Sequence, residues 1–424
     1  AMMRMRALGI AAACFGLFGA GIEARGADLE VGAALRVITP DPLLPVSGGM
    51  GAPRPSDRKM GELTARAIVF RKADVAMAVV SLDLLGFPSV LCDRVREKVK
   101  GIPPENILIG VTHTHSAPDC YAFPDGQGGH TANLDYLDRV CQLTAEAIND
   151  AASQLRPATL KIATDLAAER IAFNYYAPAL YDRRMSVVQA TGTDGKTIAT
   201  LVNYAVHPEV LGNGLGITSP DLIGPFCEKV EQTVGGLAVF INGAQGGMVT
   251  ADNRDFNRPG DPIQARWPGI QTWEECIRIG HLMADEALRI VADAPEQADP
   301  ILECFAEDLT FPVESDDLWA VVQYSPLNYP RNQEDRSGTT QSDLTIPGEA
   351  MPNVGFYLKR KMKGEHNLLF GLTNDAFGYI LAKVDFQSFP RYDYVSRVSL
   401  GEMTGEILME ASLDLVERCS PAKP

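Results

Sequence analysis

The chain of 424 residues is 46% hydrophobic and 22% charged, a balance that is typical of a packed globular protein and not of a disordered one. Its formal net charge is −16 at pH 7, and no stripe of lysine or arginine interrupts the acidic character. Such a surface repels phosphate groups, so we expect no nucleic-acid partner.

The first 26 residues are typical of a secretory signal peptide. Arg4 and Arg6 precede an apolar run over residues 7–20, and small residues follow near Ala27. The run is too short to span a bilayer and has the flanks of a cleaved signal. A helix buried in the fold is the alternative interpretation. We therefore expect a secreted or periplasmic protein without a transmembrane segment, in which residues 27–424 form a single domain.

Strand-like and helix-like segments alternate along the rest of the chain. Apolar runs bounded by turn residues predict strands over residues 62–72, 74–86, 106–115, 158–167, 185–192, 197–208, 237–247, 301–313 and 367–381. Apolar spacings of three and four predict helices over residues 90–101, 133–155, 219–234, 272–294 and 400–418. This order predicts a mixed α/β (α+β) domain with a β-sheet core flanked by helices, layered as an α-β-β-α sandwich.

Three long segments, residues 119–133, 251–271 and 316–348, carry no regular pattern and are rich in Gly, Pro, Asn or aromatic residues. We expect them to be loops that line a site. Eight cysteines are present, one of them, Cys14, inside the predicted signal, and no CxxC pair occurs. A thiolate zinc site is therefore not expected, and any disulfide pairing is left open.

Two segments resemble each other. Residues 106–114 (NILIGVTHT) and 367–375 (NLLFGLTND) share Asn, Leu, Gly and Thr at matching positions. Either two buried strands are similar by chance, or two related halves of the chain each bring a strand end to one central site.

Three of the six histidines follow predicted strands. His113 and His115 end the apolar strand NILIGVTHTH, and alternation along a strand places both on one side. His207 follows the strand TLVNYAV and precedes Pro208, which ends a strand. Each histidine alone is explained by structural hydrogen bonds. Together they favour zinc, which accepts two or three imidazoles and an oxygen ligand.

Several motifs in order along the chain resemble the catalytic domain of the neutral ceramidases, which are zinc amidases that hydrolyse N-acylsphingosines. These are THTHSAP, NYAVHP, FINGAQGG and NDAFGYI followed by RYDYVSRVSLG. The resemblance runs from about Val31 to the last helix and does not include the family's C-terminal immunoglobulin-like domain. It implies a hydrolase with one zinc ion.

The resemblance also implies a ligand set. His113 and His207 match two zinc ligands, Glu349 of IPGE matches a third, and Tyr379 of GYI matches a phenolate ligand. From the residues alone, Glu349 is better explained as a helix cap and Tyr379 as a core aromatic. His115 lies beside the metal in this reading and is the predicted catalytic residue, because an imidazole accepts and returns a proton near neutral pH.

The sequence departs from the family at one catalytic position. Aligned from FINGA, the serine of the family's GDVSP segment falls at Met248 and its aspartate at Gly246. Met248 is neither a nucleophile nor a hydrogen-bond donor, so a serine-dependent mechanism is not expected. An alternative function follows, in which the protein is a catalytically retired ceramidase-like protein that binds a lipid or a glycan.

The expected function is thus a secreted, zinc-dependent hydrolase of a small-molecule amide or ester, with a lipid as one candidate substrate. A glycine turn after a strand offers backbone N–H groups to a developing oxyanion, and it comprises Asn242, Gly243, Gly246 and Gly247. Aromatic and histidine side chains of the long loops are expected to bind substrate, namely Tyr121, Phe123, His130, Trp267 and Trp319. No GxSxG motif supports a serine hydrolase.

Overall fold

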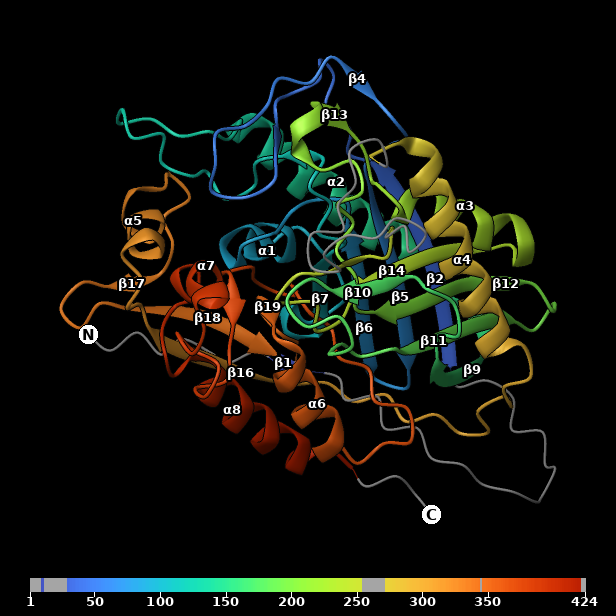
Figure 1. Cartoon of the computed structure of the whole chain (residues 1–424). Helices are drawn as coiled ribbons and strands as arrows, with labels where there is room; N and C mark the ends of the chain where they lie inside the picture. Colours follow the sequence, from blue (N-terminus) through green and yellow to red (C-terminus); the bar gives the residue numbers. More distant parts are fainter. Residues whose placement is uncertain (1–8, 11–28, 254–270, 344, 421–424) are drawn as a thin grey trace.

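A computed structural model describes residues 9–10, 29–253, 271–343 and 345–420 (Figure 1). The predicted signal peptide lies outside the described residues, except for β1 (Gly9–Ile10), which pairs with β16 (Phe305–Pro312). Trp267 also lies outside them.

The largest sheet has eight strands in the order β14-β12-β11-β9-β2-β5-β6-β7. In this order the strands span Leu237–Asn242, Thr197–Tyr204, Arg184–Gly192, Arg156–Leu166, Leu29–Val37, Thr64–Lys72, Val75–Leu82 and Ile107–Val111. The outermost pairs, β6 with β7 and β12 with β14, are parallel, and the pairs between them are antiparallel. Parallel neighbours need a crossover helix, which explains the helices that follow β6 and β12.

This sheet folds back on itself into two halves. Strand β2 pairs with β9 through only two residue pairs, Glu30 with Pro157 and Val31 with Arg156. One apolar cluster contains inward residues of both halves, such as Ile68 and Val79 on one side and Leu201 and Val239 on the other. Strand β14 therefore packs across β5, β6 and β7. Both faces of these strands are buried. Successive side chains point to opposite faces, so that in β5 Ile68 packs against the other half of the sheet and Ala67 packs against a helix.

Helices cover the outer face of each half. Helices α1 (Ser89–Arg96) and α2 (Leu134–Ser153) pack on the half formed by β2, β5, β6 and β7. Helices α3 (Ile223–Val234) and α4 (Trp273–Ala292) pack on the other half (Figure 1). The side chains of Asn133 and Thr272 accept N–H groups in the first turns of α2 and α4, which fixes where these helices begin. The predicted mixed α/β fold and its α-β-β-α layering are confirmed.

The C-terminal part of the chain adds a smaller layer beside the sandwich. A four-stranded sheet has the order β1-β16-β18-β17, with β17 at Arg331–Asn332 and β18 at Ser337–Asp343. Helix α8 (Thr404–Arg418) packs on β16 and on α6 (Pro352–Lys361). Helices α5 (Asp316–Tyr324) and α7 (Asp393–Arg397) lie nearby (Figure 1). The prediction of an irregular segment over residues 316–348 is therefore wrong in part, because a side-chain cap from Ser315 starts α5 and pairing with β16 orders β18.

Short elements connect these layers. They are the pairs β3 (Val46–Ser47) with β8 (Ala117–Pro118), β4 (Arg58–Lys59) with β13 (Ile217–Thr218), β10 (Ala172–Asn174) with β15 (Val249–Ala251) and β19 (Glu349–Ala350) with β20 (Tyr379–Ile380), and the 3-10 turns Pro104–Asn106, Asn213–Leu215 and Pro390–Tyr392.

The two similar segments lie side by side. Gly110 forms an antiparallel bridge with Thr373, and the N–H of Asn374 donates to the carbonyl of Ile109 over 2.8 Å. The side chain of Asn374 accepts the N–H of Ile109 in return, over 2.9 Å. The prediction of one strand over residues 367–381 is therefore wrong in part, because only isolated bridges at Gly371 and Thr373 and the two-residue strand β20 form there. Both segments reach the same place in the fold.

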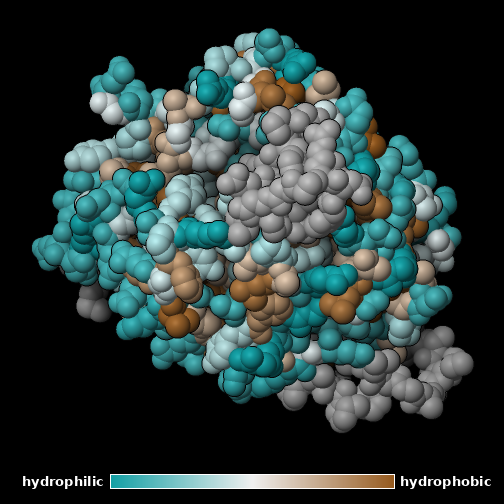
Figure 2. Space-filling model, viewed as in Figure 1, coloured by the Kyte–Doolittle hydropathy of each residue, from teal (hydrophilic) through white to brown (hydrophobic). Residues whose placement is uncertain are grey.

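The visible face of the molecule is mostly hydrophilic, with small separate hydrophobic patches (Figure 2). Among the described residues, the helices are all too short or too polar to traverse a bilayer. Six of the seven cysteines in the described part of the chain are buried.

Candidate metal centre

The two histidine motifs of the sequence lie in loops, and the strands stop before them. Strand β7 ends at Val111, and His113 adopts a left-handed backbone with φ of 71°. Strand β12 ends at Tyr204, and His207 follows in a loop. The prediction that strand alternation places His113 and His115 on one side is therefore wrong in its reason, because the chain has already left the strand. The left-handed residue brings the two rings together instead.

Backbone carbonyl groups hold the rings of His113 and His207. The Nδ1 atom of His113 is 2.5 Å from the carbonyl oxygen of Leu85, and the Nδ1 atom of His207 is 3.0 Å from that of Val249. A carbonyl accepts a hydrogen bond, so we assign the ring proton to Nδ1 in both rings. Their Nε2 atoms are then lone-pair donors, the form that binds a metal.

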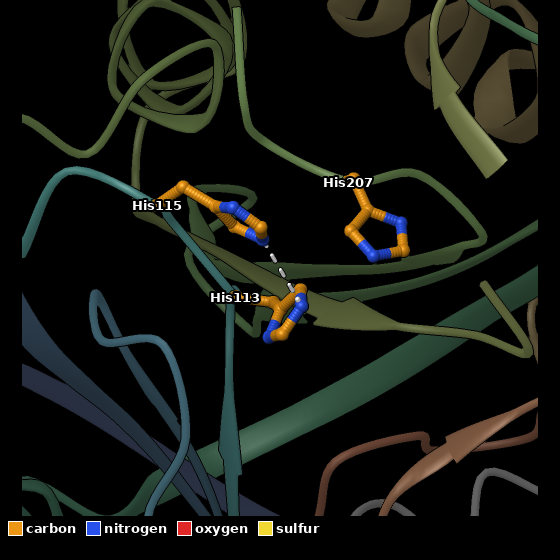
Figure 3. Close-up of side chains that lie close together, drawn as sticks. All are labelled: His113, His115 and His207. Atoms are coloured by element: carbon orange, nitrogen blue, oxygen red, sulfur yellow. Dashed lines mark hydrogen bonds between the residues drawn. The ribbon is translucent and has the colours of Figure 1, made fainter. Parts of the chain in front are cut away.

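The three imidazoles form one group. Their ligand atoms all lie within 4.8 Å of one another, and the rings face a common point (Figure 3). The Nε2 atoms of His113 and His115 are 3.3 Å apart. The structure thus brings His113, His115 and His207 together, and their roles at a metal stay predictions.

Glu349 adds a carboxylate to this group. Its Oε2 atom is 3.1 Å from Nε2 of His207 and 3.6 Å from Nε2 of His113. Burial raises the pKa of Glu349, but the two imidazoles outweigh burial and lower it below the usual value. Burial lowers the pKa of His113 to about 3. His113 is thus neutral and Glu349 ionised, which are the forms that coordinate a divalent cation. Burial lowers the pKa of His207, but its hydrogen bond to Glu349 outweighs burial and raises that pKa above the usual value.

Tyr379 lies next to Glu349. The two residues are partners in the parallel pair of β19 and β20. The Tyr379 hydroxyl donates to the sulfur of Met248 over 3.5 Å, and burial raises its pKa well above the usual range. The structure thus brings Tyr379 and Met248 to the histidine group, and the assignment of Tyr379 as a ligand stays a prediction.

The glycine turn reaches the site by close backbone contact. The N–H of Gly246 donates to the carbonyl of Ala350 over 2.8 Å. A Cβ atom at Gly246 would lie 2.2 Å from the carbonyl oxygen of Glu349. Gly247 has φ of +70° and faces Met351. Only residues without a side chain permit this approach, so Gly246 fixes where the Glu349 strand lies.

Asn242 joins the two histidine segments. Its Nδ2 atom donates to the carbonyls of Thr112 and Val206 over 3.1 and 2.8 Å, and its Oδ1 atom accepts the N–H groups of Val206 and Gly243 over 3.1 and 3.0 Å. These bonds use the full capacity of the side-chain amide. The arrangement supports a positioning role for Asn242, while its predicted contact with an oxyanion stays untested.

Sequence reasoning missed Glu209. Its Oε2 atom lies 3.7 Å from Nδ1 of His115, and the residue is buried. The signal in the sequence was a carboxylate two residues after His207 in the motif HPEV.

The histidine group lies at a pocket of about 1040 Å³, a volume that includes its open mouth. His113, His115, Glu349 and Tyr379 contribute to its lining. Its walls are mainly apolar, and they include Leu85, Tyr121, Phe123, Phe311, Val313, Leu318, Val321, Val322, Phe377, Val398 and Leu400. Of the predicted substrate-binding residues, Tyr121 and Phe123 line this pocket and stack with ring centroids 4.8 Å apart. Among the described residues, His130 and Trp319 are not part of the lining.

Comparison with solved structures gives two similar proteins. The neutral ceramidase from Pseudomonas aeruginosa superposes with a TM-score of 0.70 and 15% identity, over 94% of this chain and 76% of that chain. A ceramidase in complex with C2 superposes with a TM-score of 0.71 and 16% identity, over the same shares of 94% and 76%. No protein-family model and no curated protein sequence matches this chain. The chain therefore has the fold of the neutral ceramidases, as the sequence motifs predicted.

Proposed function

We propose that this protein is a metal-dependent hydrolase of an amide, or of an ester, with an apolar acyl group. The observation that carries the proposal is the convergence of three imidazoles and one carboxylate at a pocket with apolar walls. Pockets of this kind, with a few polar groups among apolar ones, are where small-molecule chemistry takes place.

Zinc is the proposed ion. His113, His207 and Glu349 would hold it, with Tyr379 as the predicted fourth ligand. Imidazole and carboxylate donors suit this borderline-soft cation. Bound there, zinc supplies polarisation of the scissile carbonyl and lowers the pKa of water to about 7.

The remaining steps fall to the protein's own side chains. His115 takes a proton at Nε2 from the attacking water and returns it to the leaving group. Tyr121, Phe123 and the other apolar walls bind the acyl chain and exclude bulk water, which strengthens the electrostatic interactions at the site. Met248 has no proton to give, so water rather than a side chain is the proposed nucleophile.

The shared fold guides the choice of substrate. The two similar structures are ceramidases, which favours a lipid amide of the ceramide type as the first compound to test. Simple N-acyl amides and esters of the same acyl length are the next. The apolar pocket is compatible with ceramide-type amides, with simple N-acyl amides and with esters, because each of these compounds has an acyl chain to bury.

The test combines metal analysis with hydrolysis assays. The purified protein should contain about one zinc per chain and hydrolyse at least one N-acyl substrate, and H113A should lose both properties. H281A is the matched control, because His281 is exposed on α4 and should leave both unchanged. A zinc-loaded protein that is inert toward amides and esters would contradict the proposal.

A second candidate function is a retired ceramidase-like protein that binds a lipid or a glycan. Met248 favours it, because a thioether next to Tyr379 replaces the serine of the family motif. A gain of ceramide hydrolysis in M248S would support a decayed enzyme. Activity of the unaltered protein on another compound, with no gain in M248S, would support a diverged hydrolase.

We further propose that residues 27–424 act as one exported domain after removal of residues 1–26. The site draws on segments from His113 to Tyr379, which supports treating this span as one functional unit. N-terminal sequencing of the protein recovered from the periplasm or medium tests the cleavage. An uncleaved N-terminus in a cytoplasmic fraction would contradict it.

A further inference from the structure

Glu209 is a second carboxylate next to the histidine group. Its Oε2 atom is 3.7 Å from Nδ1 of His115, and Nε2 of the same ring is 3.3 Å from Nε2 of His113. The two nitrogens of an imidazole lie on different sides of the ring. The carboxylate of Glu209 therefore lies on the side of the His115 ring away from His113. The other ring nitrogen faces His113 (Figure 3). Glu209 is 6% exposed, so this contact is shielded from solvent.

The loop that carries His115 is held against the loop that carries Glu209. The N–H of His115 donates to the carbonyl of Pro208 over 3.2 Å. On either side of His115, Thr114 Oγ1 donates to the carbonyl of Ser219 and the N–H of Ser219 donates to the carbonyl of Ser116, both over 2.8 Å. These bonds fix the separation of the two loops.

The residues that follow Glu209 are fixed as well. The buried carboxylate of Asp221 accepts the N–H groups of Val210 and Leu211 over 3.2 and 2.8 Å. Pro208 limits the backbone on the preceding side. The backbone of Glu209 is thus held between two anchored segments, and its buried carboxylate lies 3.7 Å from Nδ1 of His115.

We propose that Glu209 is a positioning residue: its carboxylate lies within ion-pair range of Nδ1 of His115, favours the ring proton on that nitrogen and keeps the Nε2 lone pair directed at the reacting centre. A neutral imidazole carries one ring proton, and a carboxylate beside Nδ1 favours the proton there. His113 and His207 obtain the same orientation from the carbonyls of Leu85 and Val249. This inference rests on the proposed function of the same site.

The test uses the zinc-loaded full chain with ¹⁵N-labelled histidine. In the unaltered protein, the His115 ring should show a protonated Nδ1 and a bare Nε2. In E209Q the ring should become a mixture of tautomers, and kcat should fall about 10–100-fold while KM changes less than about twofold. E209D should restore part of the Nδ1-protonated His115 spectrum and part of kcat. Zinc content should stay the same in all three proteins.

The control is E286Q. Glu286 is also a buried carboxylate, but it pairs with Arg289 on α4, away from the histidine group. This variant should leave the His115 spectrum and kcat unchanged. An unaltered His115 spectrum in E209Q, or loss of zinc in step with loss of activity, would overturn the positioning role. A changed spectrum in a protein that hydrolyses no substrate would support Glu209 and reject the hydrolase.

Discussion

The side-chain amide of Asn242 donates to the carbonyl of Thr112 over 3.1 Å, one residue before His113. The same nitrogen donates to Val206, one residue before His207. A residue at the end of β14 thereby sets the distance between the first and third histidines. Hydrogen bonds of this kind, made to backbone groups in loops, replace the strand pairing that has already ended there.

Removal of the Asn242 amide should therefore weaken both the fold and the metal site. N242A leaves the buried carbonyl of Thr112 and the N–H of Val206 without this partner, and each lost partner costs about 1–3 kcal/mol. We expect a lower free energy of unfolding in urea and weaker zinc binding by competition with a chelator. N353A, at an exposed position on α6, should change neither. Normal zinc affinity in N242A would show that the histidine segments are held by other contacts.

Gly246 should not tolerate a methyl group. The added Cβ would lie 2.2 Å from the carbonyl oxygen of Glu349, and backbone atoms cannot turn away as a side chain does. We expect G246A to lower the free energy of unfolding by about 1–3 kcal/mol or more, and to displace Glu349. G214A provides the comparison, because open space surrounds Gly214. Equal thermal stability of the two variants would refute the steric argument.

Tyr379 should contribute to zinc affinity if the family ligand set applies to this chain. Y379F keeps the ring, which packs 5.9 Å from the ring of Tyr394, and removes the oxygen. We expect zinc affinity to fall by roughly tenfold or more, since even residues behind the ligands contribute that much. Y324F, at an exposed position, is the control. An unchanged affinity in Y379F would remove this residue from the ligand set.

Asp221 should make stability depend on pH. Burial raises the pKa of its carboxyl to about 6 in the folded protein, above the value of about 3.9 in an unfolded chain. The folded state therefore binds the proton more tightly between about pH 4 and 6, so its stabilising effect is present at low pH and is lost as pH rises through 6. The expected loss is about 3 kcal/mol. D221N should show a flatter urea-unfolding profile from pH 4 to 6, and an unchanged slope would contradict this assignment.

The apolar wall should set the preferred acyl length. Val321 on α5 lines the pocket and is buried, so V321F adds volume inside it. We expect kcat/KM to fall about tenfold for a long-chain N-acyl substrate and to change little for an N-acetyl one. V384F places the same ring on an exposed position and should not discriminate. Equal losses for both substrates would place the acyl chain elsewhere.

The sequence by itself determined the local elements. Apolar runs predicted β5 and the two strands that precede His113 and His207, and the spacing in residues 133–155 predicted α2. The two strands before the histidines end at Val111 and Tyr204, earlier than predicted. These features depend on side chains a few residues apart, so a single sequence reveals them. The motif pattern also indicated the fold that the solved structures share.

The tertiary structure decided which distant side chains meet. Glu349 contacts His207, Glu209 faces His115, and Asn242 spans two loops only because the long sheet folds back at the short pairing of β2 with β9. Chain reversal, left-handed turns and glycine contacts place these groups, and none of them follows from a repeating pattern of apolar residues. Local periodicity is encoded in neighbours along the chain, whereas the separation of two loops depends on how the whole sandwich packs.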